Sequence, residues 1–249
     1  MQTRHVGILI VVCVMLAGCG GDAAVGLPLF LYDHFPGTAI DASKWAVDTT
    51  GGGTVGVTGG LATLDINTAG GDMQSTLEFP PANVESVAGI RAVVTPIAYS
   101  EGGGSNVRFR LFMRAYKDSA IGGATGLISD IFAQMRIRAG VFEAMVSRCD
   151  DSACASTVIF GPQALGPVTL GQTYDLKLEW DGDTYFTFHV SSLGTASFDA
   201  SVGGYANIGP PGAAKKLVEV NATSGAPTVG TMRAQVDWVG CRTVAATAC

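Results

Sequence analysis

An alternating run at Asn106–Tyr116 places arginines and aromatic rings on one side of the chain. There the polar set Arg108, Arg110, Phe112, Arg114 and Tyr116 alternates with the apolar set Val107, Phe109, Leu111, Met113 and Ala115. A period of two is typical of a β-strand with one buried and one polar face. Arginines form paired hydrogen bonds to uronate or sulfate groups, and aromatic faces stack on sugar rings. The polar face of this strand is therefore a candidate surface for an acidic or sugar-like ligand.

A second alternating run, Ile128–Arg138, is expected to pair with the first. Its apolar set is Ser129, Ile131, Ala133, Met135 and Ile137, and its polar set is Asp130, Phe132, Gln134, Arg136 and Arg138. Two such strands side by side predict the middle of a sandwich whose outer sheet surface can hold a ligand. The candidate ligand-binding residues are Arg110, Phe112, Arg114, Tyr116, Asp130, Phe132, Gln134 and Arg136.

The composition of the 249-residue chain favours an all-β protein. Charged residues make up only 14%, and 34 glycines punctuate many short alternating segments. Short strands separated by clusters of Gly, Pro, Asn and Asp are typical of a sandwich or barrel. The net charge of −6, without a block of lysines or arginines, argues against a nucleic acid partner. We therefore expect one sandwich domain that does not bind nucleic acid.

The N-terminus has the pattern of an export signal. Val6–Leu16 is an apolar run of eleven residues that follows Arg4 and His5. A membrane-spanning helix needs about 20 apolar residues, so this run is typical of a signal peptide. The adjoining Leu-Ala-Gly-Cys, which ends at Cys19, resembles the lipobox of bacterial lipoproteins. The alternative is an ordinary cleavage site that happens to contain a cysteine.

The lipobox resemblance implies a division of the chain. Residues 1–18 are the signal peptide, residues 19–26 are the lipidated Cys19 with a short tether, and residues 27–249 are the sandwich domain. Lipid on the Cys19 thiol would anchor the mature protein to a membrane. By the sorting rule of that family, Gly20 in place of an aspartate favours the outer membrane of a bacterial cell envelope.

The predicted sandwich domain contains four cysteines, Cys149, Cys154, Cys241 and Cys249. Outside the cytoplasm an even set of cysteines is expected to pair. Of the possible connectivities, the local one is the simplest, with disulfides 149–154 and 241–249. The domain contains no Cys-x-x-Cys pair, which makes metal binding by the cysteines the weaker alternative.

The predicted domain opens with the segments Asp33–Gly37, Ile40–Trp45 and Gly59–Leu64, and it later contains the hairpin strand Tyr174–Gly182 and the closing strand Gln235–Val239. These segments resemble motifs of concanavalin A-like lectin and glucanase jelly rolls. Those proteins often open with Asp-x-Phe-x-Gly, a Leu/Ile-Asp-x-x-Lys-Trp turn and a Gly-x-Leu-x-Leu strand. The resemblance implies a single-domain antiparallel β-sandwich of the jelly-roll type.

The resemblance also implies a structural calcium ion where the two ends of the chain meet. In those jelly rolls the ion is held by oxygens near the opening Asp-x-Phe, by a glycine carbonyl and by an aspartate of the closing strand. The corresponding residues are Asp33, Gly60 and Asp237. Calcium takes about six to eight oxygen ligands, so backbone carbonyls and water would complete the set. His34 stands where relatives commonly carry an acid, and the alternative is that both aspartates accept hydrogen bonds at strand ends.

The glucan-hydrolysing branch of these jelly rolls uses an E-x-D-x-E strand, which this chain lacks. A retaining glycosidase needs two carboxyl groups about 5–5.5 Å apart. The best counterpart, Asp130–Gln134, offers one carboxylate, and Glu143 on the next predicted strand faces Asp130 only in a suitable register. The chain also lacks the Gln-x-His of the alginate-lyase branch. The sequence therefore argues against catalysis, and an atypical polysaccharide-cleaving enzyme stays as an alternative.

Three hypotheses for function remain. The first is a membrane-anchored surface or periplasmic lipoprotein whose domain binds a carbohydrate, such as an acidic polysaccharide, without cleaving it. The second is a structural or protein-binding lipoprotein whose arginines pair internally with Asp130, Glu143 and their neighbours, since charges are often interleaved on solvated sheets. The third is an atypical polysaccharide hydrolase or lyase. A calcium ion is the one cofactor implied, and the partners are a membrane and either a polysaccharide or a surface protein.

Overall fold

The computed structural model shows two packed antiparallel sheets. The described residues are 28–68, 70–102, 106–119, 126–223 and 229–249. The predicted signal peptide, the lipidation site Cys19 and the tether lie outside these residues. In the part of the chain that the structure describes, no helix is long and apolar enough to cross a membrane.

Sheet A has the long strands β6 and β15 at its centre. Its strands, in their order across the sheet, are β13 (Gly194–Asp199), β12 (Tyr185–Val190), β11 (Tyr174–Trp180), β6 (Val87–Glu101), β15 (Gly230–Thr243), β4 (Leu61–Thr68) and β3 (Thr54–Thr58). A further strand, β1 (Phe30–Asp33), pairs with β15. The first strand therefore lies beside the last one, as the jelly-roll motifs predict.

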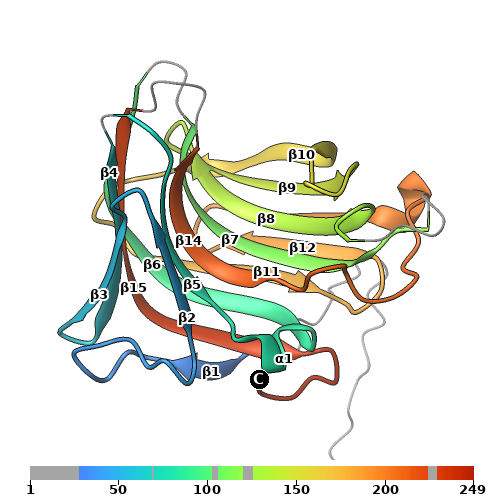
Figure 1. Ribbon diagram of the computed structural model, residues 1–249, viewed down its shortest axis with the longest axis horizontal. Coiled ribbons are helices and arrows are strands. Elements are labelled where there is room, and N and C mark those ends of the chain that lie inside the picture. Colours follow the sequence, from blue (N-terminus) through green and yellow to red (C-terminus); the bar gives the residue numbers. More distant parts are fainter. Residues whose placement is uncertain (1–27, 69, 103–105, 120–125, 224–228) are drawn as a thin grey trace, which may run out of the picture.

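Sheet B contains both alternating strands that the sequence singles out. Its strands, in order, are β10 (Ser156–Pro167), β9 (Val141–Cys149), β8 (Asp130–Arg138), β7 (Asn106–Lys117), β14 (Lys216–Thr223), β5 (Met73–Glu78) and β2 (Ala46–Thr50). Figure 1 shows β14, β7, β8 and β9 curving side by side across the molecule. The helical turns α1 (Pro81–Val84) and η1 (Ala200–Gly203) lie in connections between strands.

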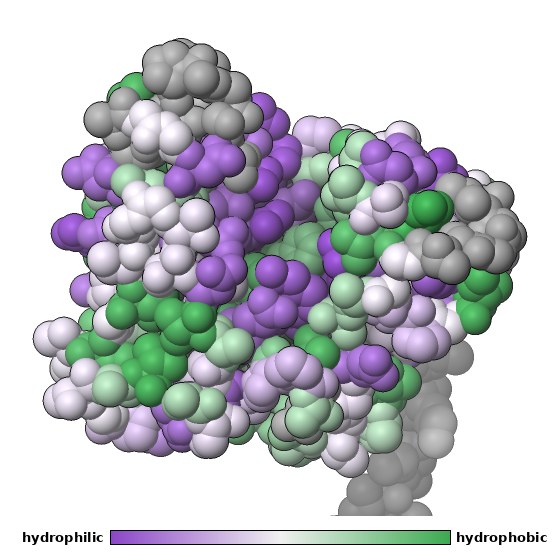
Figure 2. Space-filling model, in the orientation of Figure 1, coloured by the Kyte–Doolittle hydropathy of each residue, from purple (hydrophilic) through white to green (hydrophobic). Residues whose placement is uncertain are grey.

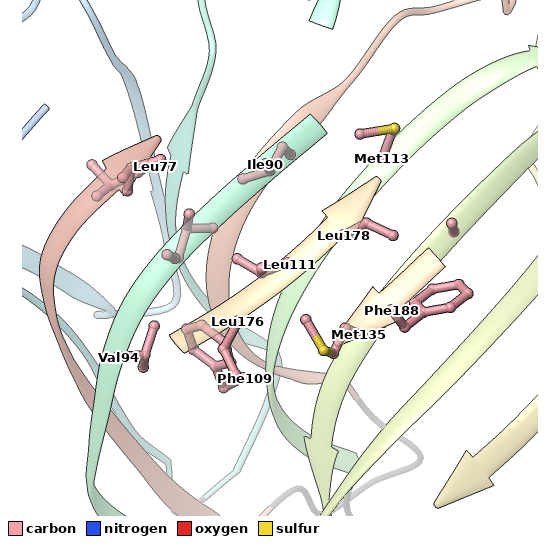
Figure 3. Close-up of a cluster of buried hydrophobic side chains, with 14 of the residues drawn as sticks. Leu77, Ile90, Val94, Phe109, Leu111, Met113, Met135, Leu176, Leu178 and Phe188 are labelled. Atoms are coloured by element: carbon pink, nitrogen blue, oxygen red, sulfur yellow. The ribbon is translucent and has the colours of Figure 1, made fainter. Parts of the chain in front are cut away.

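The core lies between the sheets and is formed by the apolar set of each strand. β7 contributes Phe109, Leu111 and Met113, which are fully buried. Figure 3 shows these side chains gathered with Leu176 and Leu178 of β11. Burying one such side chain stabilises the fold by about 1.5–3 kcal/mol. This burial confirms the inward set of the arginine strand, and it leaves the arginines on the outer side of sheet B.

One residue of the predicted polar face lies in the core instead. The pairing of β7 with β8 shifts register between Arg114 and Tyr116. A β-bulge places an extra residue in one strand and so changes which side chains face inward beyond it. Tyr116 consequently points between the sheets, fully buried, with its ring stacked on Trp180 and Phe186 at centroid distances of 6.0 and 6.2 Å. The prediction that Tyr116 lies on the ligand-binding face is therefore wrong.

Both predicted disulfides are confirmed. Cys149–Cys154 closes the turn between β9 and β10, and Cys241–Cys249 ties the C-terminus to β15. Cross-links around such small loops restrict the unfolded chain and contribute about 2–3 kcal/mol each. The antiparallel all-β sandwich expected from the composition and the motifs is confirmed as well.

Candidate functional site

The outer side of sheet B carries a hollow lined by hydrophilic residues. Figure 2 shows the hollow near the middle of this side, over the strands that Figure 1 labels β14, β7 and β8. The register of the strands arranges the outward side chains in rows that cross the sheet, one row for every second residue. Two neighbouring rows contain four of the arginines, and we name them the paired row and the open row.

The paired row consists of Thr76, Glu219, Arg110, Arg136 and Glu143, in order across β5, β14, β7, β8 and β9. Arg110 forms an ion pair with Glu219, whose side chain is only 1% exposed. Arg136 contacts the Glu143 carboxylate through Nε at 2.9 Å and Nη2 at 2.8 Å. Each arginine of this row has its own glutamate, so the row as a whole is neutral.

The open row is the next row toward one end of the strands and consists of Gln74, Asn221, Arg108, Arg138 and Val141. Arg108 and Arg138 are opposite each other because the adjoining Phe109 and Ile137 are paired. The Nε of Arg108 donates a hydrogen bond to Asn221 Oδ1 at 2.8 Å. Arg138 is exposed and forms no ion pair with any described residue.

The guanidinium of Arg108 lies in surroundings that disfavour its charge. Burial lowers its pKa, the positive charge of Arg110 lowers it further, and the resulting pKa is about 9. Arg136 and Arg138 act in the same direction, and only the charge of Glu219 opposes them. The open row therefore holds two facing arginines without a carboxylate of its own.

The predicted aromatic residues lie together beneath the surface. Phe112 and Phe132 pack with ring centroids 5.3 Å apart and are only 5% and 7% exposed. Leu217 and Cys149 complete a small apolar cluster around them. The Arg110 guanidinium covers Phe112 at 4.8 Å from the ring centroid. A ring must have an open face to stack on a sugar, so these phenylalanines support the floor of the hollow instead.

Asp130, the candidate carboxylate, is fully buried at the start of β8. Its Oδ1 accepts hydrogen bonds from Gly212 N at 2.8 Å and Lys117 Nζ at 3.1 Å. Arg114 Nε lies 3.6 Å from Oδ2. Burial lowers the pKa of Arg114, and the charge of Asp130 opposes that effect. Arg114 and Asp130 therefore form an internal ion pair that fastens sheet B to the segment before β14.

Glu143 does not approach Asp130. It faces Arg136, six residues farther along β8, which separates the two carboxylates by about 20 Å. Glycosidases hold their two carboxyl groups about 5–10 Å apart. Asp130 and Glu143 therefore cannot act as such a pair.

Two acids of this face do lie on adjacent strands, Glu78 on β5 and Glu219 on β14. Glu219 is opposite Thr76, two residues from Glu78, so the two glutamates are diagonal neighbours. The backbones of diagonal neighbours lie about 7–8 Å apart. Glu78 is bound to Lys215 at 3.2 Å, and Glu219 is bound to Arg110. Each of these two carboxylates therefore has a cation partner of its own.

Gln134 lies in the row beside the paired row, between Phe112 and Met145. It is 4% exposed, and its Oε1 is buried without a hydrogen-bond partner among the described residues. Gln134 therefore lies beneath the hollow rather than in it. Of the arginines in the two rows, Arg138 is exposed and Arg108 and Arg110 are half-buried, whereas Arg136 is only 5% exposed.

The register brings the three residues of the predicted calcium site to the same part of sheet A. Asp33 is opposite Val239 of β15, and Gly60 adjoins the end of β4 that pairs with β15 at Val236. Asp33 is 1% exposed, and its carboxylate accepts hydrogen bonds from Trp45 Nε1 at 2.8 Å and Phe35 N at 2.9 Å. Gly60 lies in the turn between β3 and β4, and Asp237 is exposed at a register shift of β15. The described residues contain no group of three or more His, Cys, Asp or Glu side chains placed to hold a metal. Because the predicted set also uses a glycine carbonyl, other backbone carbonyls and water, the calcium site stays a prediction.

Arg108 and Arg138 are missing from the set of ligand-binding residues that the sequence predicts. The alternating pattern puts both on the polar face but does not distinguish them from the other arginines. What distinguishes them is the lack of an acid partner, and that depends on the pairing of β7 with β14, which is more than 100 residues away. No local signal in the sequence finds them.

Neither a protein-family model nor a curated protein matches the sequence. Among solved structures, one match is a 1,3-α-1,4-β-D-galactose-4-sulfate-3,6-anhydro-D-galactose 4 galactohydrolase, with 11% identity, a TM-score of 0.54 and coverage of 90% of this chain and 98% of that one. Another is the κ-carrageenase of Pseudoalteromonas carrageenovora in complex with an oligotetrasaccharide of κ-carrageenan, with 10% identity, a TM-score of 0.51 and coverage of 92% and 98%. A sialidase matches 86% of this chain at 10% identity and a TM-score of 0.48, and the chain spans only 18% of its length.

Identities this low establish the fold alone. The galactohydrolase and the κ-carrageenase match along nearly the whole of both chains, so the likeness covers the sandwich rather than a fragment of it. The described chain therefore has the concanavalin A-like jelly-roll fold that its opening and closing motifs predict.

Proposed function

We propose that this protein binds a polysaccharide in the hollow of sheet B and does not cleave it. The observation that carries the proposal is the fixed set of guanidinium groups on the floor of the hollow. Glu219 and Glu143 orient Arg110 and Arg136, and Arg136 is buried beneath the surface. Arg110 is 16% exposed, and a guanidinium with five N–H donors retains donors for a ligand. Side chains that are already ordered lose little entropy on binding, which favours recognition of a sugar chain along the face.

The fold comparison supports a sugar polymer as the ligand. The κ-carrageenase structure holds an oligotetrasaccharide of κ-carrageenan, and the name of the galactohydrolase includes galactose-4-sulfate and 3,6-anhydro-galactose. Both share the fold of this chain over at least 90% of its length. The proposal that the sugar is not cleaved follows from the carboxylates of the hollow, which are bound to cations or lie too far apart.

The proposal includes the location of the protein. On the strength of the Leu-Ala-Gly-Cys junction, we place the protein in the bacterial cell envelope, anchored through lipid on Cys19. Cys19→Ser should yield an unprocessed protein or one released from the membrane fraction. A variant that is still processed and fractionates with membranes would contradict the anchor.

Retention on immobilised polysaccharides tests the binding function. The panel contains a carrageenan, a polyuronate and a neutral β-glucan, and reducing ends are counted after incubation with each polymer in solution. We expect retention on at least one polymer and no increase in reducing ends. If no polymer retains the protein, the proposal fails, and a rise in reducing ends would show an enzyme.

Two matched double variants locate the binding face. Arg110→Gln with Glu219→Gln removes one ion pair of the floor without leaving a buried charge unpaired. Arg91→Gln with Asp175→Asn removes an ion pair of 2.6 Å on the outer side of sheet A. Retention should weaken by about tenfold in the first variant and stay unchanged in the second. Equal retention of both variants would show that the polysaccharide does not bind in the hollow.

A structural or protein-binding role is the second candidate function. The observation that favours it is the internal pairing of Arg110, Arg114 and Arg136, each with its own acid. This role predicts no retention on any polysaccharide and a loss of stability when one of these arginines is replaced alone.

A further inference from the structure

Both the paired row and the open row contain two facing arginines, but the residues on either side of the arginines differ between the rows. In the paired row Glu219 and Glu143 stand on either side of the two arginines. In the open row the same places are held by Asn221 and Val141. The backbone positions are equivalent, because each residue of one row is two residues from its counterpart on the same strand. The open row therefore has the two positive charges without the two negative ones.

We infer that Arg108 and Arg138 form a subsite for one anionic group of the polysaccharide, a sulfate ester or a uronate carboxylate. The inference rests on the proposed function and deepens it. It names the class of sugar, an anionic one, and the residues that bind the anionic group. Like charges directly opposite each other on adjacent strands destabilise a sheet. A bound oxyanion between the two guanidiniums turns that repulsion into two attractions.

The chemistry of Arg108 suits an oxyanion. Asn221, which is 1% exposed, accepts the Nε–H of Arg108 at 2.8 Å and so fixes the plane of the guanidinium. The terminal amino groups of Arg108 make no hydrogen bond to any described residue. Paired N–H groups of this kind bind carboxylate and sulfate oxygens in a two-point arrangement. Arg138 is exposed and adds a second charge at the mouth of the subsite.

The nearby acids do not neutralise the open row. Glu219 is bound to Arg110, and Glu101 accepts the hydroxyl hydrogen of Tyr99 at 2.6 Å. Neither forms an ion pair with Arg138 or Arg108 among the described residues. The internal segments outside the described residues, which are 69, 103–105, 120–125 and 224–228, contain no Asp or Glu. Within the described residues and these internal segments, no acid forms an ion pair with Arg108 or Arg138.

Binding of defined oligosaccharides to the full chain tests the subsite. The probes are a sulfated galactan tetrasaccharide, an oligouronate and a neutral galactan tetrasaccharide, measured by calorimetry at low and physiological salt. We expect at least one of the two anionic probes to bind about tenfold or more tightly than the neutral one, and salt to reduce the difference. Comparison of the two anionic probes identifies the group, and preference for either one supports the subsite.

Two variants and one control place the charge. Asn221→Asp keeps the shape of the side chain and supplies the missing carboxylate to Arg108, and Arg138→Gln removes the exposed charge. Each should lower the affinity for the preferred anionic probe about tenfold and leave the neutral probe unchanged. Arg233→Gln, which removes a half-exposed arginine paired with Asp65 on sheet A, should leave both affinities unchanged.

The possible results separate this inference from the proposed function. If the neutral and anionic probes bind equally, the anion subsite is wrong while the polysaccharide-binding function stands. If no probe binds, both fail. If an anionic probe is preferred but Asn221→Asp and Arg138→Gln bind it as the unmodified chain does, the anion lies elsewhere and the subsite is wrong. Thermal unfolding of each variant confirms that a loss of affinity is not a loss of fold.

Discussion

The paired row and the open row cross the same strands of sheet B, two residues apart. Their arginines nevertheless differ, because only those of the paired row have acid partners. In the paired row, Arg110 and Arg136 are bound by Glu219 and Glu143, so one ion pair joins β7 to β14 and the other joins β8 to β9. In the open row, Arg108 and Arg138 face each other beside residues that carry no charge. The difference teaches that arginines on one face of a sheet are not equivalent, because only some of them have an acid partner.

Burial sharpens the contrast between the rows. A buried ion pair contributes little net stability, but removing one partner leaves a charge that neither water nor protein compensates. The paired row is therefore sensitive to substitution, and its arginines are poor choices for a test of binding by single replacement. The open row already bears an uncompensated charge in the folded protein, so substitutions there are expected to be neutral or stabilising. The predictions below follow from this asymmetry.

The largest effect is expected when the paired row loses a glutamate. Glu219→Gln leaves the Arg110 guanidinium, which is 16% exposed, without its anion, and breaking such a pair costs about 3–5 kcal/mol. Each kcal/mol lowers the Tm of a chain of this size by about 2–4 °C. Urea and thermal unfolding measure the loss. The matched change in the open row, Arg138→Gln, should alter stability by less than about 0.5 kcal/mol. Equal losses in both variants would erase the distinction between the rows.

A buried cation on the other side of sheet B extends the comparison to pH. Lys216 of β14 is fully buried, and its Nζ donates to the carbonyl oxygens of Val84 at 2.7 Å and Glu85 at 3.5 Å. Burial lowers its pKa from 10.5 to about 8, with the charge of Glu85 opposing. The charged form is thus disfavoured in the folded state, and the resulting loss of stability is fully present below about pH 8. It is relieved as the pH rises toward 10.5, the pKa of the unfolded chain.

The free energy of unfolding should therefore increase by up to about 3 kcal/mol between pH 8 and pH 10.5, relative to a variant without this lysine. Lys216→Met is the reference, because it keeps a long side chain and removes the titrating group. Denaturant unfolding across this pH range gives the difference in slope. Parallel pH profiles for the two proteins would show that Lys216 is solvated or compensated.

Adding an acid to the open row should reduce the difference in charge between the two rows. Asn221→Asp places a carboxylate 2.8 Å from the Nε of Arg108 and should raise the free energy of unfolding by about 1–2 kcal/mol. The same change at the exposed Asn67 of β4 adds equal charge away from Arg108 and should have an effect below about 0.5 kcal/mol. Stabilisation together with lost affinity for an anionic sugar would mark the open row as a place where stability is given up for function. A less stable Asn221→Asp protein would show that Arg108 needs no anion.

Much of the fold can be predicted from the sequence because its signals are local. The period of two assigns the faces of β7 and β8, and the close spacing of Cys149 with Cys154 and of Cys241 with Cys249 predicts the disulfides. Tyr116 breaks the pattern because one bulge depends on the packing of β7 against β8, which alternation does not encode.

The site could be predicted only in part, because its chemistry depends on register. The sequence places the arginines on one face, but the pairing of Arg110 with Glu219 joins residues 109 positions apart. The same holds for Arg108 and Asn221, which are 113 positions apart. Which arginine lacks an acid partner thus depends on the order and register of the strands. The burial of Phe112 and Phe132 is likewise invisible along the chain, since both stand at polar-face positions.

The smallest effect on stability is expected for the addition of calcium. The Asp33 carboxylate of the predicted calcium site already accepts a hydrogen bond from the indole of Trp45. Like Glu219, Asp33 is buried and already engaged, here by the indole of Trp45 at 2.8 Å and the Phe35 amide at 2.9 Å, with Lys44 Nζ at 3.6 Å. A calcium ion at Asp33 would share the carboxylate with the indole and would approach the positive charge of Lys44. A ligand that binds only the folded form raises stability by about 2.7 kcal/mol at 100 times its Kd, which would move the Tm by several degrees. We expect instead a change of less than about 1 °C between millimolar calcium and chelator, with Asp237→Asn behaving as the unmodified chain does. A rise of several degrees that Asp237→Asn abolishes would show that the closing strand and Asp33 rearrange around the ion.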